Sequence, residues 1–279
     1  MRGLPVRRKP LDIGSIRARK PARSIIEIPE QVMQALSDGY VETMNLTEWL
    51  ASDRQLLLES ILKQIDLDLG TEAQSLWTSE LLSQSALKQS FAIGKWLSSQ
   101  IKVGDEAWRS LSTHPSDIVR EWSAIIVGLA DDISFARKLA WIKPFADDEH
   151  SGLREIAWLA LRAEVIRDPV HAIKCLVPWT GSRNERLRRY ASEITRPCGV
   201  WTSHVRQLKE QPELGLPILE PLLADDSRYV KNSVGNWLND ASKSQPGWVQ
   251  ATTALWLAKS TSVHTKYIVK RALRTIEKQ

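Results

Sequence analysis

The stretch DIVREWSAIIVG, Asp117 to Gly128, recurs in altered form along the second half of this 279-residue chain. SGLREIAWLALR begins at Ser151, ERLRRYASEITR at Glu185 and RYVKNSVGNWLN at Arg228. Each copy places an aliphatic residue before a basic one and continues with small and apolar residues at helical spacing. The aliphatic positions are 34, 34 and 43 residues apart, and a weaker copy, YIVKRALRTI, puts the next one 39 residues further on.

Periods of this length are typical of repeats that each contain a pair of helices. One pair cannot close a hydrophobic core by itself, so neighbouring pairs must stack. From Ile25 onward apolar residues follow a 3.6-residue spacing almost everywhere, and strand-like alternation is nearly absent. The sequence therefore predicts an all-α protein, an α-α superhelix (solenoid) of helical pairs. The opening of the copy at Asp117 resembles a HEAT repeat, and the second helix of each pair is expected to line the concave face.

Charge is distributed unevenly along the chain. Residues 1–26 carry eight basic side chains and one acidic side chain, and the segment from Arg183 onward carries sixteen basic and nine acidic ones. This asymmetry favours a polyanionic partner, although a solvated tail and a patchy surface would give the same composition. We predict a disordered basic arm over residues 1–26 and a single HEAT-like repeat domain over residues 27–279.

Several functional classes find no support in the sequence. No run approaches the roughly 18 apolar residues of a membrane span, and the first residues lack the apolar core of a secretory signal. Cys175 and Cys198 have no CxxC spacing, the five histidines are scattered, and no glycine-rich phosphate loop is present. We expect a cytoplasmic, nucleoid-associated monomer that needs neither a metal nor another cofactor and does not bind membranes.

The stretch NERLRRYASEITRPCGVW, from Asn184 to Trp201, is predicted to be the second helix of one pair. Asn184 is a suitable N-cap, and Pro197 ends the helix. The expected buried stripe consists of Leu187, Tyr190, Ala191 and Ile194. Outside that stripe fall Arg188, Arg189, Ser192, Glu193 and Arg196.

The next pair is expected to bury an equivalent stripe, made of Val230, Val234, Trp237, Leu238 and Ala241. Lys231 and Asp240 are then candidates for an exposed or cleft-facing side of that helix.

Two stretches carry a resemblance to a known family. RRYASEITRPCGVW resembles the arginine, Ser-Glu, Arg-Pro and tryptophan motif of the HEAT-like-repeat DNA alkylation repair glycosylases, the AlkC/AlkD-type superfamily. ILEPLLADDSRYVKNSVGNWLNDASKSQP resembles its second hallmark, and KPFADDEHSGLREIAWLALR is a weaker match. The resemblance extends from about Trp141 to Arg274, about half of the chain.

The resemblance implies an enzyme that removes cationic N-alkylated bases, such as 3-methyladenine-type lesions, from duplex DNA by hydrolysing the N-glycosidic bond. It makes Glu193 an active-site carboxylate, Trp201 an active-site aromatic residue and Asp240 a second acid. The residues it places against DNA are Arg188, Arg189 and Arg196, to which we add Lys231 as a candidate. Glu155 and Trp158, which share one helix in the weaker match, are secondary site candidates.

The chain also departs from the family pattern. RPCGVW lacks the second arginine and the proline that precede the tryptophan in the AlkC-like branch, and no Trp-x-x-x-Asp pair of the AlkD-like branch occurs on an earlier helix. Two alternatives therefore stay open. A noncatalytic binder of DNA structure would have its carboxylates in ion pairs that face away from the basic cleft, and a protein-binding scaffold would have an apolar groove.

The proposed chemistry suits these residue types independently of the family. A cationic base is already a good leaving group, and a carboxylate such as Glu193 or Asp240 can stabilise the cation that forms at the sugar. An indole face attracts a cation by about 0.5–2 kcal/mol, a role for Trp201 and for Trp158. Arginines hold phosphates without reading sequence.

Overall fold

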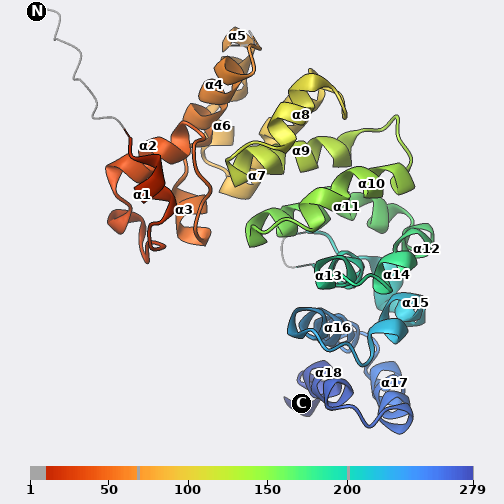
Figure 1. The fold of residues 1–279 in the computed structure, drawn as a ribbon. Helices are drawn as coiled ribbons and strands as arrows, with labels where there is room; N and C mark the ends of the chain where they lie inside the picture. Colours follow the sequence, from red (N-terminus) through yellow and green to blue (C-terminus); the bar gives the residue numbers. More distant parts are fainter. Residues whose placement is uncertain (1–10, 68–69, 200–201, 279) are drawn as a thin grey trace, which may run out of the picture. The chain divides into compact units, whose positions relative to one another are not determined.

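The computed structural model describes residues 11–67, 70–199 and 202–278, and every regular element in these ranges is a helix (Figure 1). The all-α prediction is confirmed. None of the described helices is long and apolar enough to cross a membrane. The contacts between Cα atoms divide the chain into two compact units, residues 1–126 and 127–279, and each is described by itself. The prediction of a single repeat domain over residues 27–279 stays a prediction.

The first unit is built from short helices. They are α1 (Ile13–Arg17), η1 (Ile25–Glu27), α2 (Glu30–Ser37), α3 (Leu46–Ala51), α4 (Arg54–Gln64), α5 (Gly70–Leu76), α6 (Ser79–Leu82), α7 (Ala86–Ser98), α8 (Glu106–Ser112) and α9 (Asp117–Leu129), which continues into the second unit.

The described part of the predicted basic arm is folded. Asp12 caps α1 by accepting a hydrogen bond from the Ser15 backbone N–H, and Ile16 is buried in one hydrophobic cluster with Val32 of α2. The Arg19 guanidinium lies 2.5 Å from the carboxylate of the buried Glu48. The predicted disorder of the arm is therefore wrong for residues 11–26. Residues 1–10 lie outside the described residues.

Two carboxylates are fully buried at the start of α9. Asp117 accepts hydrogen bonds from the backbone and hydroxyl of Thr43, and Glu121 Oε1 accepts one from Trp49 Nε1 at 2.8 Å. Glu121 Oε2 has no hydrogen-bond partner among the described residues. Burial, with a smaller contribution from the Asp117 charge, raises the pKa of Glu121 to about 8. The Glu121 side chain is thus protonated in the folded protein at neutral pH.

Replacing Glu121 by glutamine should stabilise the protein increasingly as the pH rises. The folded-state pKa of Glu121 lies above its usual 4.5, so the stability it contributes is complete below that value and is lost as the pH rises towards 8. Glutamine cannot ionise and still accepts from Trp49. At about 1.4 kcal/mol per pKa unit, its advantage in the free energy of unfolding should grow by about 3 kcal/mol between about pH 5 and pH 8. Chemical denaturation at both pH values measures this change. The same substitution at the exposed Glu106 is the matched control. A stability difference for Glu121→Gln that does not change with pH would contradict the assigned pKa.

The second unit repeats a pair of helices. Its elements are α10 (Phe135–Ala146), α11 (Ser151–Arg167), α12 (Pro169–Thr180), α13 (Glu185–Ile194), α14 (Arg206–Glu210), η2 (Pro212–Gly215), α15 (Leu216–Leu219), η3 (Glu220–Leu222), α16 (Arg228–Ala241), α17 (Pro246–Lys259), α18 (Val263–Leu273) and η4 (Ile276–Lys278). Helices α11, α13, α16 and α18 pack in succession as one layer, flanked by α10, α12, α15 and α17 (Figure 1). We call this layer the second-helix layer. The four sequence copies that begin at Ser151 or later each start on one of its helices, and the predicted helical-pair repeat is confirmed.

The basic residue of the repeat pattern has a structural task. Nη1 of Arg154 donates to the backbone carbonyls six and five residues earlier, at 2.6 and 2.9 Å. Arg188 makes the same two bonds at 3.0 and 3.1 Å, and Arg120 in the first unit makes them at 2.7 and 3.1 Å. Each of these arginines ties the turn before its helix to the helix itself, which accounts for the arginine in these three copies.

Candidate functional site

Helix α13 begins as the sequence predicts but is more deeply covered. Asn184 is its N-cap and accepts from the Arg186 backbone N–H, and all four residues of the predicted stripe are buried. Arg189, Ser192 and Glu193, which we placed outside that stripe, are buried as well. The reason is that α13 packs against α16 as well as against α11 and α12, which covers more than one face of the helix.

The Glu193 carboxylate is held by three neighbours. Ser233 of α16 donates a 2.7 Å hydrogen bond to Oε2, Arg196 donates one of 2.6 Å to Oε1, and Arg189 lies at 3.5 Å. Burial alone would raise the pKa of Glu193, but the two arginines and the Ser233 hydroxyl outweigh it and hold this pKa below its usual value. Glu193 is therefore a fixed negative charge at neutral pH.

Arg196 joins the two predicted catalytic acids. Its Nε and Nη2 bind the carboxylate of Asp240 at 2.9 and 2.7 Å, while Nη1 binds Glu193. Asp240 lies near the C-terminal end of α16, is buried, and also accepts a 3.0 Å bond from Lys243. The structure thus brings Glu193 and Asp240 to the same guanidinium, so that one positive charge lies between two carboxylates.

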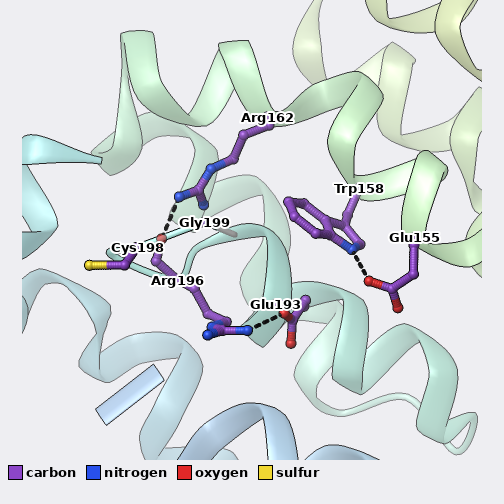
Figure 2. Close-up of a pocket in the computed structure, with 7 residues that line it drawn as sticks. All are labelled: Glu155, Trp158, Arg162, Glu193, Arg196, Cys198 and Gly199. Carbon is purple, nitrogen blue, oxygen red and sulfur yellow. Dashed lines mark hydrogen bonds and ion pairs between the residues drawn. The ribbon is translucent and has the colours of Figure 1, made fainter. Parts of the chain in front are cut away.

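A pocket opens beside this group of charges. Figure 2 shows its seven lining residues, which come from α11, α13 and the segment that follows α13: Glu155, Trp158, Arg162, Glu193, Arg196, Cys198 and Gly199. It encloses about 440 Å³ of empty volume, part of it open to solvent. Asp240 lies outside this lining.

The secondary candidates Glu155 and Trp158 form one wall of the pocket. Trp158 Nε1 donates to Glu155 Oε2 at 2.7 Å, which fixes the orientation of the indole (Figure 2). Glu155 also lies 2.7 Å from the Arg189 guanidinium, which stacks over the ring of Tyr229 at 4.8 Å. An indole, a half-exposed carboxylate and Glu193 consequently share one small space.

Arg162 of α11 is also part of the pocket lining. Its guanidinium donates to the backbone carbonyls of Ile194 and Arg196, so it holds the end of α13 and the start of the next segment. Burial, and then the charge of Arg196, lowers the pKa of Arg162 to about 10. Its Nε, which faces no acceptor among the described residues, is a buried donor at the pocket.

The other predicted site residues lie elsewhere. Arg188 binds Asp225 through Nε and Nη2 and holds the turn carbonyls through Nη1. Lys231 lies on α16, where its Nζ donates to His264 Nδ1 at 2.9 Å. Trp201 falls outside the described residues. Within the described ranges no group of three or more His, Cys, Asp or Glu side chains could hold a metal ion.

Comparison with known proteins identifies the family. A model of the DNA alkylation repair enzyme family matches residues 52–276. The chain belongs to this family. A solved structure of the alkylpurine DNA glycosylase AlkC of Pseudomonas fluorescens, bound to DNA containing an abasic site analog, is 25% identical with a TM-score of 0.64 over 80% of this chain and 62% of that one. AlkD2 of Streptococcus mutans is 21% identical with a TM-score of 0.57 over 77% of this chain and 98% of that one. The predicted resemblance is confirmed.

A further relative is uncharacterised. Protein YhaZ of Bacillus subtilis (strain 168) is 40% identical over 120 residues, which amount to 43% of this chain and 33% of YhaZ. The chain thus spans about a third of the length of YhaZ and 62% of the AlkC chain.

The sequence analysis missed Cys198 and Gly199 of the pocket lining, and it also missed two residues that bond within the site, Ser233 and Arg162. Ser233 carries no local signal, because its neighbour Glu193 comes from another helix 40 residues away. Arg162 had a signal: it ends its repeat copy at the same position as Arg196 ends the next copy. Aligned copies of a solenoid repeat place such residues on one face of adjacent helices.

Proposed function

We propose that this protein is a DNA glycosylase that hydrolyses the N-glycosidic bond of cationic N-alkylated bases, of the 3-methyladenine type, in duplex DNA. The observation that carries the proposal is a pocket where the ionised Glu193 and the indole of Trp158 lie together in a DNA alkylation repair enzyme. AlkC, which shares the fold, is an alkylpurine DNA glycosylase.

The main requirement that this reaction places on the protein is electrostatic stabilisation of the charge that develops on the sugar. The bond between C1′ of the sugar and the base nitrogen breaks, and its electron pair neutralises the cationic base, which leaves without needing a proton. The sugar develops oxocarbenium character that a fixed carboxylate stabilises, and water adds to C1′ and loses its proton. Two carboxylates line the pocket, Glu155 and Glu193. Glu193 is the buried one, and its neighbours keep it ionised, so we give it this role. Asp240 supports it through Arg196, and the Trp158 face attracts the cationic base.

A second candidate function is supported by one observation. Both Glu193 and Asp240 are engaged in ion pairs with Arg196, and such ion pairs are one half of what we expect of a family member that binds DNA without catalysis. The other half, carboxylates that face away from the cleft, does not hold for Glu193, which lines the pocket. The charged lining of the pocket does not favour the third alternative, a protein scaffold with an apolar groove.

Base release from methylated DNA distinguishes the two candidates. We expect the purified protein to release 3-methyladenine from methylated duplex DNA, with no release of normal bases or of O6-methylguanine, which is a neutral lesion. Chromatography of the ethanol-soluble products measures the release. If the protein binds duplex DNA in a salt-dependent way and releases no base, the noncatalytic function replaces the enzymatic one.

A further inference from the structure

The arginines that the sequence places against DNA carry little free charge. Arg188 is paired with Asp225, Arg189 with Glu155 and Glu193, and Arg196 with Glu193 and Asp240. All three side chains are largely buried. A phosphate would have to displace a carboxylate from each guanidinium. The cations that hold the DNA backbone must therefore be sought elsewhere.

Helices α16 and α18 carry an unusual ladder of side-chain bonds. Two donors of α18 and its C-cap residue Arg274 bond to three asparagines of α16, each 35 residues earlier in the chain. Tyr267 donates to Asn232 at 2.7 Å, Arg271 to Asn236 at 2.9 Å and Arg274 to Asn239 at 2.9 Å. The two arginines donate through Nε. An amide oxygen orients a guanidinium and leaves its positive charge in place, whereas a carboxylate would cancel that charge.

The outer ends of both guanidiniums are available. Among the described residues, neither Arg271 nor Arg274 forms an ion pair, and their Nη atoms make no hydrogen bond. The stem of Arg271 lies against Gly235 of α16, where an added Cβ would come within 2.9 Å of Arg271 Cβ and Cδ. Two Nη donors with Nε already held form a pre-oriented fork, the geometry that suits a phosphate group.

Lys231 extends this cationic face along α16. Its Nζ donates to His264 and lies 5.6 Å from the centre of the Tyr267 ring, and within the described ranges it has no carboxylate partner. Partial burial, and then the Arg271 charge, lowers the pKa of Arg274, as expected where positive charges are not neutralised. Arg274 is bonded to Asn239, whose neighbour Asp240 is bonded to Arg196 in the lining of the pocket. The face is thus linked to the pocket through α16 within the second-helix layer.

We infer that Arg271, Arg274 and Lys231 form the surface that holds the phosphate backbone of duplex DNA beside the pocket, in place of the arginines of α13. The inference rests on the proposed function only in taking duplex DNA as the polyanion. The asparagine ladder fixes the spacing of the forks before DNA binds, which reduces the conformational entropy lost on binding. These contacts carry no sequence information.

The test is binding of unmodified duplex DNA at several salt concentrations, followed by fluorescence anisotropy. Each phosphate contact contributes about 0.9 to the slope of log K against log salt. The double variant Arg271→Gln/Arg274→Gln should lower that slope by about 2 and weaken binding about tenfold or more at low salt. The matched control is Lys174→Gln/Lys259→Gln, which removes the same charge from α12 and α17 and should leave the slope unchanged.

A second variant tests whether the position of the Arg271 side chain matters, apart from its charge. Gly235→Ala keeps every charge but displaces Arg271, so it should weaken DNA binding with its helical circular dichroism retained. A wild-type slope and affinity in the double variant, or a wild type that does not bind duplex DNA, overturns the inference. The assay needs no base release. A lowered slope without release contradicts only the glycosylase proposal, and release with an unchanged slope contradicts only the inference.

Discussion

The variant Glu193→Gln is expected to release methylated bases about 100- to 1000-fold more slowly than the wild type, with its affinity for duplex DNA retained. Loss of a group that stabilises charge in a water-excluded transition state typically has an effect of this size. Glutamine keeps the shape of the side chain, and its amide oxygen still accepts from Ser233. It lacks the negative charge that would face the developing sugar cation. Single-turnover release from methylated duplex DNA measures the effect.

Glu164→Gln is the matched control for this variant. Glu164 also lies in an ion pair, 2.6 Å from the buried Lys138, but it does not line the pocket. It should lose comparable pairing energy without losing base release. Equal rates for Glu193→Gln and the wild type would remove Glu193 from the mechanism. The lowered pKa of Glu193 also predicts how base release depends on pH. Release by the wild type should persist across neutral pH and fall only below about pH 4.5, as the carboxylate is protonated.

The repeat architecture was predictable because the local spacing of apolar residues determines it. Stacked helical pairs must each expose an apolar stripe to their neighbours, so the stripes of α13 and α16 appear in the sequence at helical spacing. Asn184 was predictable as an N-cap for the same reason, since its role depends only on the residues beside it. The order within residues 11–26 was missed because Ile16 packs against residues of α2 that lie outside its own local pattern.

The site was less predictable because its partners come from different helices. A helical wheel shows which face of α13 is most apolar, but not that α16 covers the side that carries Glu193. The recurring basic residue of the repeats was visible in the sequence. The sequence could not show that in one repeat this residue, Arg188, bonds to the turn before its own helix and to Asp225. Glu155 and Trp158, expected only as secondary candidates, line the same pocket as Glu193.

Arg196 should also be the side chain on which the stability of the second unit depends most. Replacing it by methionine keeps the apolar stem and leaves Glu193 and Asp240 as buried carboxylates beside each other without their shared partner. Breaking a buried ion pair from one side typically costs about 3–5 kcal/mol. We expect Arg196→Met to lower the free energy of unfolding by that amount, measured by urea denaturation. Arg206→Met, which breaks an exposed pair with Glu210, should cost less than about 1 kcal/mol.

The triple variant Arg196→Met/Glu193→Gln/Asp240→Asn tests the physical cause. If the loss comes from uncompensated buried charge, neutralising both acids should restore most of the stability, because the three effects are coupled through one network. If the loss came only from the missing side-chain contacts of Arg196, the triple variant would be at least as unstable as the single one. The charges of Glu193 and Asp240 require Arg196 for stable folding, and they are also the charges proposed to act on the sugar cation. A triple variant that is stable but releases no base would therefore separate the role of this network in stability from its role in catalysis.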